Sequence, residues 1–417
     1  MGKYFSDVVE KAVADLYYCY DKERAAAAAE ALFFAAKEQE DGDACYFLSR
    51  CFSGTAYSWL YHPFQENQEA AFSMLRQGIL WGSAVAVLGA LRMDMLTPEL
   101  RALMPFSTMR EAWEAVYEKA VAGCLFCQYM IGNTYYFLDI IEIDDRKESQ
   151  FASQAAWDDW RREQMQQSLP WFEKAFAGGM GIAGRNLHNY YQYGRGSLIP
   201  PQPEKALEVA RQGAELGYPD WMYLLGVKLF DNYNQKEEGL VWARKAAEAG
   251  HLMAWSLLGD AYARGIVVER NDSYALEYYE KGAAGGRSVY SSYCAGEYYF
   301  CGVGTPVDYA RAVQYLGESF ALSDEPYEKA HMLGICYLLG YGCQQDMALG
   351  RTLLERSQNS RYRNYGLGLM YAEGLGVPQD IERGVEYLKA AGNYGPAEQA
   401  LKNYKKSFFG VWRRVKN

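Results

Sequence analysis

A repeated twelve-residue segment constrains the fold of this chain more than any other feature of its sequence. Each copy begins with a small residue, carries an apolar or aromatic residue three positions later and ends in glycine, as in residues 206–217 and 384–395. Ten copies align, two of them without the final glycine. Their last residues lie 33 to 41 residues apart, except for one interval of 56. Such a period predicts a protein of stacked structural repeats.

The repeated segment predicts a helix, which we call helix B. Twelve residues make about three helical turns. The terminal glycines run from Gly42 in the first copy to Gly395 in the last. Glycine suits the left-handed conformation that ends many helices. We therefore expect each helix B to end at this residue.

A second pattern follows each helix B and predicts a partner, helix A. It centres on a small residue that follows a leucine and precedes a tyrosine by three positions, as in Leu258, Gly259 and Tyr262. These offsets lie on one face of a helix. A glycine inside a helix costs about 1 kcal/mol relative to alanine, so its recurrence predicts that another backbone packs against it. We call this central position the slot; it is occupied by Ser49, Gly89, Gly132, His188, Gly226, Gly259, Gly296, Gly334 and Gly368.

Turn residues connect the two helices of each repeat. Paired glycines, such as Gly302 and Gly304, follow several slots by six and eight residues. Aspartates stand three or four residues before the small residue of helix B, where an N-cap belongs: Asp272, Asp308, Asp346 and Asp380. Each repeat is therefore expected to be a helical hairpin that buries its apolar face only against its neighbours.

The combined pattern resembles the Sel-1-like repeat, a relative of the tetratricopeptide repeat. Its clearest copy is YGLGLMYAEGLGVPQDIERGVEYLKAAGNYG, residues 365–395. The resemblance implies an all-α fold, a right-handed α/α superhelix or solenoid of about ten helix-turn-helix repeats. It also implies an adaptor or protein-binding scaffold, often bacterial, without enzymatic chemistry of its own.

The pattern divides the chain into a repeat region and two ends. The repeats are regular from residue 181 and less regular before it, where Arg92 replaces the tyrosine of the pattern. The expected parts are an N-terminal capping helix at 1–30, a solenoid at 31–395 (irregular at 31–180, regular at 181–395) and a basic C-terminal capping helix at 396–417.

The long interval places an insertion at about 138–167. It contains an acidic loop with Glu142 and Asp144, followed by Trp157 and Trp160 on an expected helical extension. Insertions in repeat proteins often lie on a binding face. A solvated elongation of one helix B explains the same residues, and the sequence leaves both interpretations open.

The C-terminal segment is basic and aromatic. Lys405, Lys406 and Arg413 alternate with Phe408 and Trp412, with no acidic residue after position 398. Such a segment can bind an anionic membrane or a nucleic acid. A helix that closes the solenoid needs the same apolar and basic faces, and we favour this capping role.

Composition excludes several classes of protein. A net charge of −10 argues against nucleic-acid binding by the chain as a whole. The longest apolar run, residues 79–91, is too short to cross a bilayer, and the first fifteen residues lack the apolar core of a signal peptide. Nine unevenly spaced cysteines are expected to be reduced. We therefore expect a cytoplasmic protein.

Sequence motifs for catalysis or metal binding are absent. No HExxH, GxSxG, phosphate-binding or dinucleotide-binding motif occurs. Cys124 and Cys127 have the spacing of a zinc knuckle but lack a second pair, and core packing explains them better. We expect no enzymatic activity, catalytic residue, metal or cofactor.

The resemblance to tetratricopeptide-like repeats implies that helix A lines the concave face, where a protein or peptide partner would bind. Inward residues are expected three before, one after and four or five after the slot. Alternatively, several of these tyrosines pack between neighbouring helices. The expected partner-binding residues are Tyr129, Asn133, Tyr136, Arg185, Asn189, Gln192, Tyr223, Asp260, Arg264, Tyr293, Glu297, Phe300, His331 and Tyr365.

Overall fold

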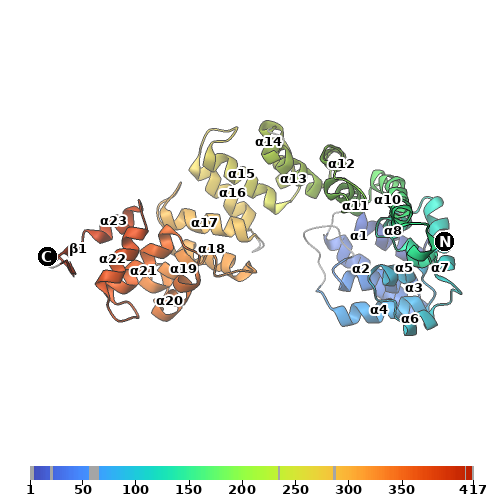
Figure 1. Cartoon of the computed structure of the whole chain (residues 1–417), viewed down its shortest axis with the longest axis horizontal. Coiled ribbons are helices and arrows are strands. Elements are labelled where there is room, and N and C mark those ends of the chain that lie inside the picture. Colours follow the sequence, from blue (N-terminus) through green and yellow to red (C-terminus); the bar gives the residue numbers. More distant parts are fainter. Residues whose placement is uncertain are drawn as a thin grey trace. The chain divides into compact units, whose positions relative to one another are not determined.

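The computed structural model divides the chain into two compact units, Met1–Met222 and Tyr223–Asn417, each built from helical hairpins (Figure 1). It describes residues 4–18, 22–55, 65–232, 235–284, 288–408 and 410–415. No helix in these ranges is long and apolar enough to cross a membrane.

The first unit alternates helices A and B along the chain. Helices A are α3, α5, α8 and α11, and helices B are α2, α4, α7, α10 and α12. The elements are α1 (Asp7–Tyr17), α2 (Lys22–Gln39), α3 (Gly42–Phe52), α4 (Gln68–Leu80), α5 (Ala84–Arg92), α6 (Pro98–Leu103), α7 (Met109–Val121), α8 (Leu125–Tyr136), α9 (Ile140–Ile143), η1 (Glu148–Gln150), α10 (Gln154–Ala177), α11 (Gly181–Tyr193) and α12 (Pro203–Glu215).

The second unit continues the alternation and ends in a short hairpin of strands. The boundary between the units falls within α13 (Pro219–Val227). The following elements are η2 (Lys228–Asn232), α14 (Lys236–Glu248), α15 (Leu252–Arg264), α16 (Asp272–Ala283), α17 (Val289–Cys301), α18 (Tyr309–Leu322), α19 (His331–Leu339), α20 (Met347–Arg356), α21 (Arg361–Glu373), α22 (Ile381–Ala390), α23 (Gly395–Leu401), β1 (Tyr404–Lys406) and β2 (Trp412–Arg414).

Helices pack in the pairs that the repeat predicts. Each helix A packs on the helix B that follows it, as α15 does on α16 and α17 on α18. Buried side chains such as Tyr279, Leu316 and Leu354 fill the space between pairs in the second unit. The predicted all-α fold of helix-turn-helix repeats is confirmed.

The slot glycines lie where the helices of a pair approach closely. A Cβ atom on Gly259 would lie 2.7 Å from the ring of Tyr279, and one on Gly132 would lie 2.5 Å from the ring of Phe172. Only some slots face backbone: a Cβ atom on Gly226 would lie 3.0 Å from the carbonyl oxygen of Gly239. The predicted close packing is confirmed, but the contacting group is most often a large side chain.

Most predicted helix ends are confirmed. Gly302, Gly340 and Gly374 end helices A in the left-handed conformation. Gly265, which is not among the predicted glycine pairs, does the same. The side chains of Asp308, Asp346 and Asp380 accept the N-cap hydrogen bonds of their helices B.

Three predicted helix-end residues are wrong by a few positions. Asn271 rather than Asp272 caps α16, because the residue four positions before the small residue holds the N-cap. Gly42 is the first residue of α3, and Glu40 has the positive φ expected of Gly42. Gly395 opens α23, and Gly392 takes the positive φ there.

Both ends of the chain differ from the predicted single capping helices. Residues 1–30 contain α1 and the first half of α2, which pack together as a hairpin. The described residues of 396–417 form the remainder of α23, followed by the antiparallel pair β1–β2. In this pair Tyr404 is buried against the last repeat, and Trp412 packs beside it on the same cluster.

The insertion at 138–167 contains α9, η1 and the first half of α10. This half of α10 elongates a helix B, as one of the two interpretations predicts. Trp157 and Trp160 stack at 5.2 Å with nearly parallel rings, and Phe151 packs against both. Trp157 is buried, so the elongation is held by an aromatic cluster and is not solvated on all sides.

Candidate functional site

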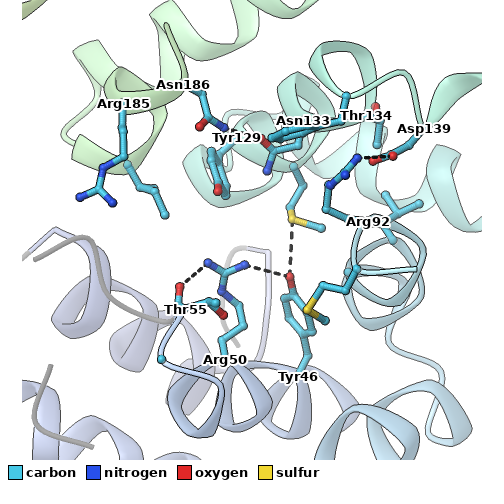
Figure 2. A pocket seen from close by; sticks show the side chains of 17 residues that line it. Tyr46, Arg50, Thr55, Arg92, Tyr129, Asn133, Thr134, Asp139, Arg185 and Asn186 are labelled. Carbon is cyan, nitrogen blue, oxygen red and sulfur yellow. Dashed lines mark hydrogen bonds and ion pairs between the residues drawn. The ribbon is translucent and has the colours of Figure 1, made fainter. Parts of the chain in front are cut away.

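Four successive helices A of the first unit line a recess of about 370 Å³, which we call the A-face recess (Figure 2). They are α3, α5, α8 and α11, joined by the loops that follow α3, α5 and α8. Its lining residues are Tyr46, Arg50, Gly54, Thr55, Leu88, Gly89, Arg92, Met93, Tyr129, Met130, Asn133, Thr134, Phe137, Asp139, Ile182, Arg185 and Asn186.

Arg50 forms the floor of the A-face recess. Its Nε donates a hydrogen bond to the Tyr17 hydroxyl at 2.6 Å, its Nη1 to the Tyr46 hydroxyl at 3.4 Å, and its Nη2 to the Thr55 carbonyl oxygen. The guanidinium carbon also lies 5.6 Å from the centroid of the Phe126 ring. Figure 2 shows the guanidinium held between Thr55 and Tyr46.

All partners of Arg50 in the described structure are neutral. Burial raises the pKa of Tyr17 and of Tyr46 above their ordinary value, so both hydroxyls keep their protons near neutral pH. Burial by itself would lower the pKa of Arg50, but the surrounding tyrosines hold it above its ordinary value. Arg50 therefore carries a positive charge that none of these partners neutralises.

A second arginine is paired with the carboxylate of the recess. Arg92 Nη1 donates to Asp139 Oδ1 and its guanidinium lies 3.9 Å from the centroid of the Phe137 ring. Burial raises the pKa of Asp139 to about 6, against the lowering effect of Arg92. Oδ2 of Asp139 is buried without a hydrogen-bond partner among the described residues.

The amide side chains of Asn133 and Asn186 line the recess on α8 and α11. Asn186 on α11 donates to Asn133 Oδ1 on α8 at 2.7 Å, which ties the two helices together. Arg185, the neighbour of Asn186, is exposed; burial raises the pKa of Asp220 to about 6, against the lowering effect of Arg185. The recess thus has three arginines and one carboxylate in a chain whose net charge is −10.

Three of the residues expected to bind a partner, Tyr129, Asn133 and Arg185, meet in the A-face recess. Tyr136 is buried behind it against Phe172 and does not line it. Asn189 and Gln192 are partly exposed on α11, outside the recess.

The expected binding residues at the start of the second unit are partly engaged within the unit. Tyr223 stacks on His251 at 4.3 Å. Asp260 Oδ1 accepts hydrogen bonds from the hydroxyls of Tyr279 and Tyr290 at 2.7 and 2.8 Å. Arg264 is exposed, 3.9 Å from Asp260.

The expected residues further along the second unit form a contact chain around Tyr362. Its hydroxyl donates to Glu297 at 2.9 Å, and its ring stacks on His331 at 5.5 Å. The remaining contacts are those of Tyr293 with His331, Phe300 with Tyr362, and Tyr365 with Tyr394. These residues pack between helices, as the alternative interpretation of the tyrosines describes, and their role in binding stays a prediction.

Sequence reasoning missed Arg50, Tyr46 and Arg92. The offsets of three before and one after the slot, applied to Ser49, give Tyr46 and Arg50, so the pattern contained this information. Arg92 stands where other repeats carry tyrosine. Arg50, which follows a serine slot, and Arg92, which replaces a tyrosine, both depart from the repeat pattern, and both line the recess.

The chemistry of the recess suits binding. Within the described ranges, no three or more histidine, cysteine, aspartate or glutamate side chains are grouped to hold a metal ion. Cys124 and Cys127 are buried, as core packing predicts. Charged guanidinium groups and amides at fixed positions can instead hold a polar ligand by hydrogen bonds.

A family model described as Sel1 repeat matches six segments of the chain: residues 184–218, 214–251, 256–286, 292–324, 330–357 and 364–393. No curated relative matches the chain. The six matches follow the repeats at 181–395 that the sequence pattern identifies as regular.

Solved structures similar to the chain include a Sel1 repeat protein from Oxalobacter formigenes, with a TM-score of 0.47, 22% identity and coverage of 79% of this chain and 89% of that one. A protective antigen with an SLR fold from uropathogenic Escherichia coli has a TM-score of 0.47, 19% identity and coverage of 92% and 83%. An immunity protein from Pseudomonas aeruginosa has a TM-score of 0.31, 19% identity and coverage of 64% and 84%.

Proposed function

The chain is a Sel1 repeat protein, and from that premise we propose that it is a non-enzymatic scaffold that binds a protein partner through the A-face recess. The observation that carries the proposal is the convergence of side chains from four successive helices A on one hollow. Repeat proteins bind through surfaces to which several repeats contribute equivalent positions. Tyr46, Tyr129 and Arg185 occupy the same offset, three before the slot, in three repeats.

The composition of the recess supports a polypeptide ligand. Tyrosine and arginine are enriched among the residues that contribute most to protein interfaces, because they combine apolar area with directed hydrogen bonds. The Asn186–Asn133 hydrogen bond and the Arg92–Asp139 ion pair fix the walls before a ligand arrives. A preformed site loses less conformational entropy on binding.

Affinity capture with charge-reversed variants tests this function. The wild-type chain and two variants, Arg185→Glu in the recess and Arg76→Glu on α4, are immobilised and exposed to lysate of the source organism. Both arginines are exposed, and α4 contributes no residue to the recess. We expect a protein retained by the wild type and Arg76→Glu but lost from Arg185→Glu.

The contrary result is a captured set that is identical for all three proteins. In that case the partner binds elsewhere or the chain has no scaffold function. We further propose a cytoplasmic location, which fractionation of cells that produce the tagged chain would test.

The alternative function is a membrane or nucleic-acid adaptor that acts through the basic tail. The tail directs Tyr404 and Trp412 onto its own last repeat, which leaves fewer aromatic groups for such a ligand. Binding of liposomes and oligonucleotides by the full chain, compared with a chain ending at Gly395, distinguishes this adaptor from the scaffold.

A further inference from the structure

We propose that the A-face recess recognises an acidic side chain, the carboxylate of an Asp or Glu within an extended segment of the partner. The inference rests on the proposed scaffold function and specifies its ligand. It begins from Arg50, whose charge is the least compensated in the recess.

The hydrogen-bond partners of Arg50 leave its charge unbalanced. They are two tyrosine hydroxyls and one carbonyl oxygen, and the described structure contains no ion pair to this guanidinium. A charge removed from water is costly unless an opposite charge accompanies it. Arg50 is only partly accessible, at the floor of the recess. An anion that enters from the open side would supply the missing charge.

The other charges of the recess add to the attraction for an anion. Asp139 is committed to Arg92, so this pair contributes little net charge. Arg185 lies at the rim, where Asp220 outside the lining offsets part of its charge. The remaining lining residues are apolar or neutral. The recess is therefore cationic within an acidic protein, which steers anionic ligands toward it.

The geometry favours a polypeptide carboxylate over a small free anion. The lining extends over four helices, a larger hollow than one small ion fills. Met93, which is exposed, and Ile182 and Phe137, which are partly exposed, offer apolar area beside the arginines. Asp139 Oδ2 is a hydrogen-bond acceptor without a partner among the described residues, available to a donor such as a peptide N–H after a small side-chain movement. An extended segment supplies a carboxylate, apolar groups and N–H donors together.

The test uses two pools of fluorescent dodecapeptides with blocked termini and uncharged random flanks. One pool carries Glu at its centre and the other carries Gln, so the central carboxylate is the only difference. Binding to the full chain is measured by fluorescence anisotropy. We expect the Glu pool to bind about tenfold more tightly, the effect of one charge-assisted hydrogen-bonded pair.

Variants assign the preference to Arg50. Arg50→Met keeps the apolar stem and should abolish the preference, whereas Arg50→Lys should retain part of it and Arg76→Gln all of it. Arg50 contacts Tyr17 and Tyr46, so if Arg50→Met does not fold, Arg185→Gln provides the second variant and should weaken the preference.

The outcomes separate the inference from the scaffold function. Equal binding of both pools, weakened in each case by Arg185→Gln, would overturn the carboxylate inference and leave the scaffold function intact. Displacement of the Glu pool by inorganic phosphate at concentrations where acetate has no effect would assign the recess to phosphate and also overturn it. Failure of both pools to bind, or binding unaffected by any recess variant, would overturn both.

Discussion

At the scale of single residues, the group that lies opposite each slot determines whether the slot has room for a side chain. Gly259 faces the Tyr279 ring, Gly296 faces Leu316 and Gly226 faces the backbone of Gly239. The sequence predicts that something approaches each slot, because glycine recurs where helix propensity disfavours it. In these three repeats the opposing group belongs to the paired helix B, 13 or 20 positions further along the chain, and the repeat pattern does not specify it.

Substitution of two helical glycines by alanine tests this close packing. Gly259→Ala should lower the free energy of unfolding by about 1–3 kcal/mol through overpacking against Tyr279. Gly317→Ala on α18, where the added methyl group meets nothing within 4 Å, should raise it by up to about 1 kcal/mol. Urea denaturation measures both. Equal effects of the two substitutions would show that the slot is not close-packed.

Buried histidine gives the second unit a pH dependence that can be tested. Burial lowers the pKa of His331 to about 4 from an ordinary 6.5, so below pH 6.5 the unfolded chain takes up a proton that the folded chain does not. Stability therefore falls as the pH falls from 6.5 toward 4, by up to about 1.4 kcal/mol per pH unit.

The variant His331→Phe keeps a ring against Tyr362 but removes the titrating group. Between about pH 6.5 and pH 5, its unfolding free energy should decrease by about 1.5 kcal/mol less than that of the wild type. Asp139 and Asp220, with raised pKa values, act in the opposite direction in both proteins and cancel in the comparison. Parallel pH profiles of the two proteins would contradict the burial of His331.

At the scale of elements, local rules predict the repeat helices well and the ends of the chain poorly. Asp308, Asp346 and Asp380 cap helices B because each stands four residues before the small residue, a spacing visible in the sequence. The residues after Gly395 do not carry the repeat pattern, so the pattern gives no register there. The hairpin β1–β2 instead closes the last repeat by tertiary contacts with α21 and α22.

The C-terminal hairpin should detach when its anchoring ring is removed. Trp412 lies 4.4 Å from Lys389 Nζ, while Arg414 and Tyr404 both bind Glu373. Trp412→Ala should make the bonds after Lys405 and Lys406 more sensitive to trypsin and lower the melting temperature slightly. Phe408→Ala is the matched control, because that side chain is 99% exposed. Equal cleavage of wild type and Trp412→Ala would contradict the anchoring role.

At the scale of the whole molecule, the repeat determines the fold and its exceptions determine the candidate site. The spacing of slots is sufficient to predict alternating helices A and B across both units. The A-face recess depends on side chains from four repeats and on two departures from the pattern, Arg50 after a serine slot and Arg92 in place of tyrosine. The repeat pattern cannot predict how such departures meet, because it describes what the repeats share.

Hydrogen–deuterium exchange of the chain with and without its captured partner tests the central claim most directly. Binding in the A-face recess should slow exchange in the residues of α3, α5, α8 and α11 that line it, and should leave the helices B α4 and α7 unchanged. Arg185→Glu should remove this protection. Protection confined to α4 and α7, or to the second unit, would contradict the account.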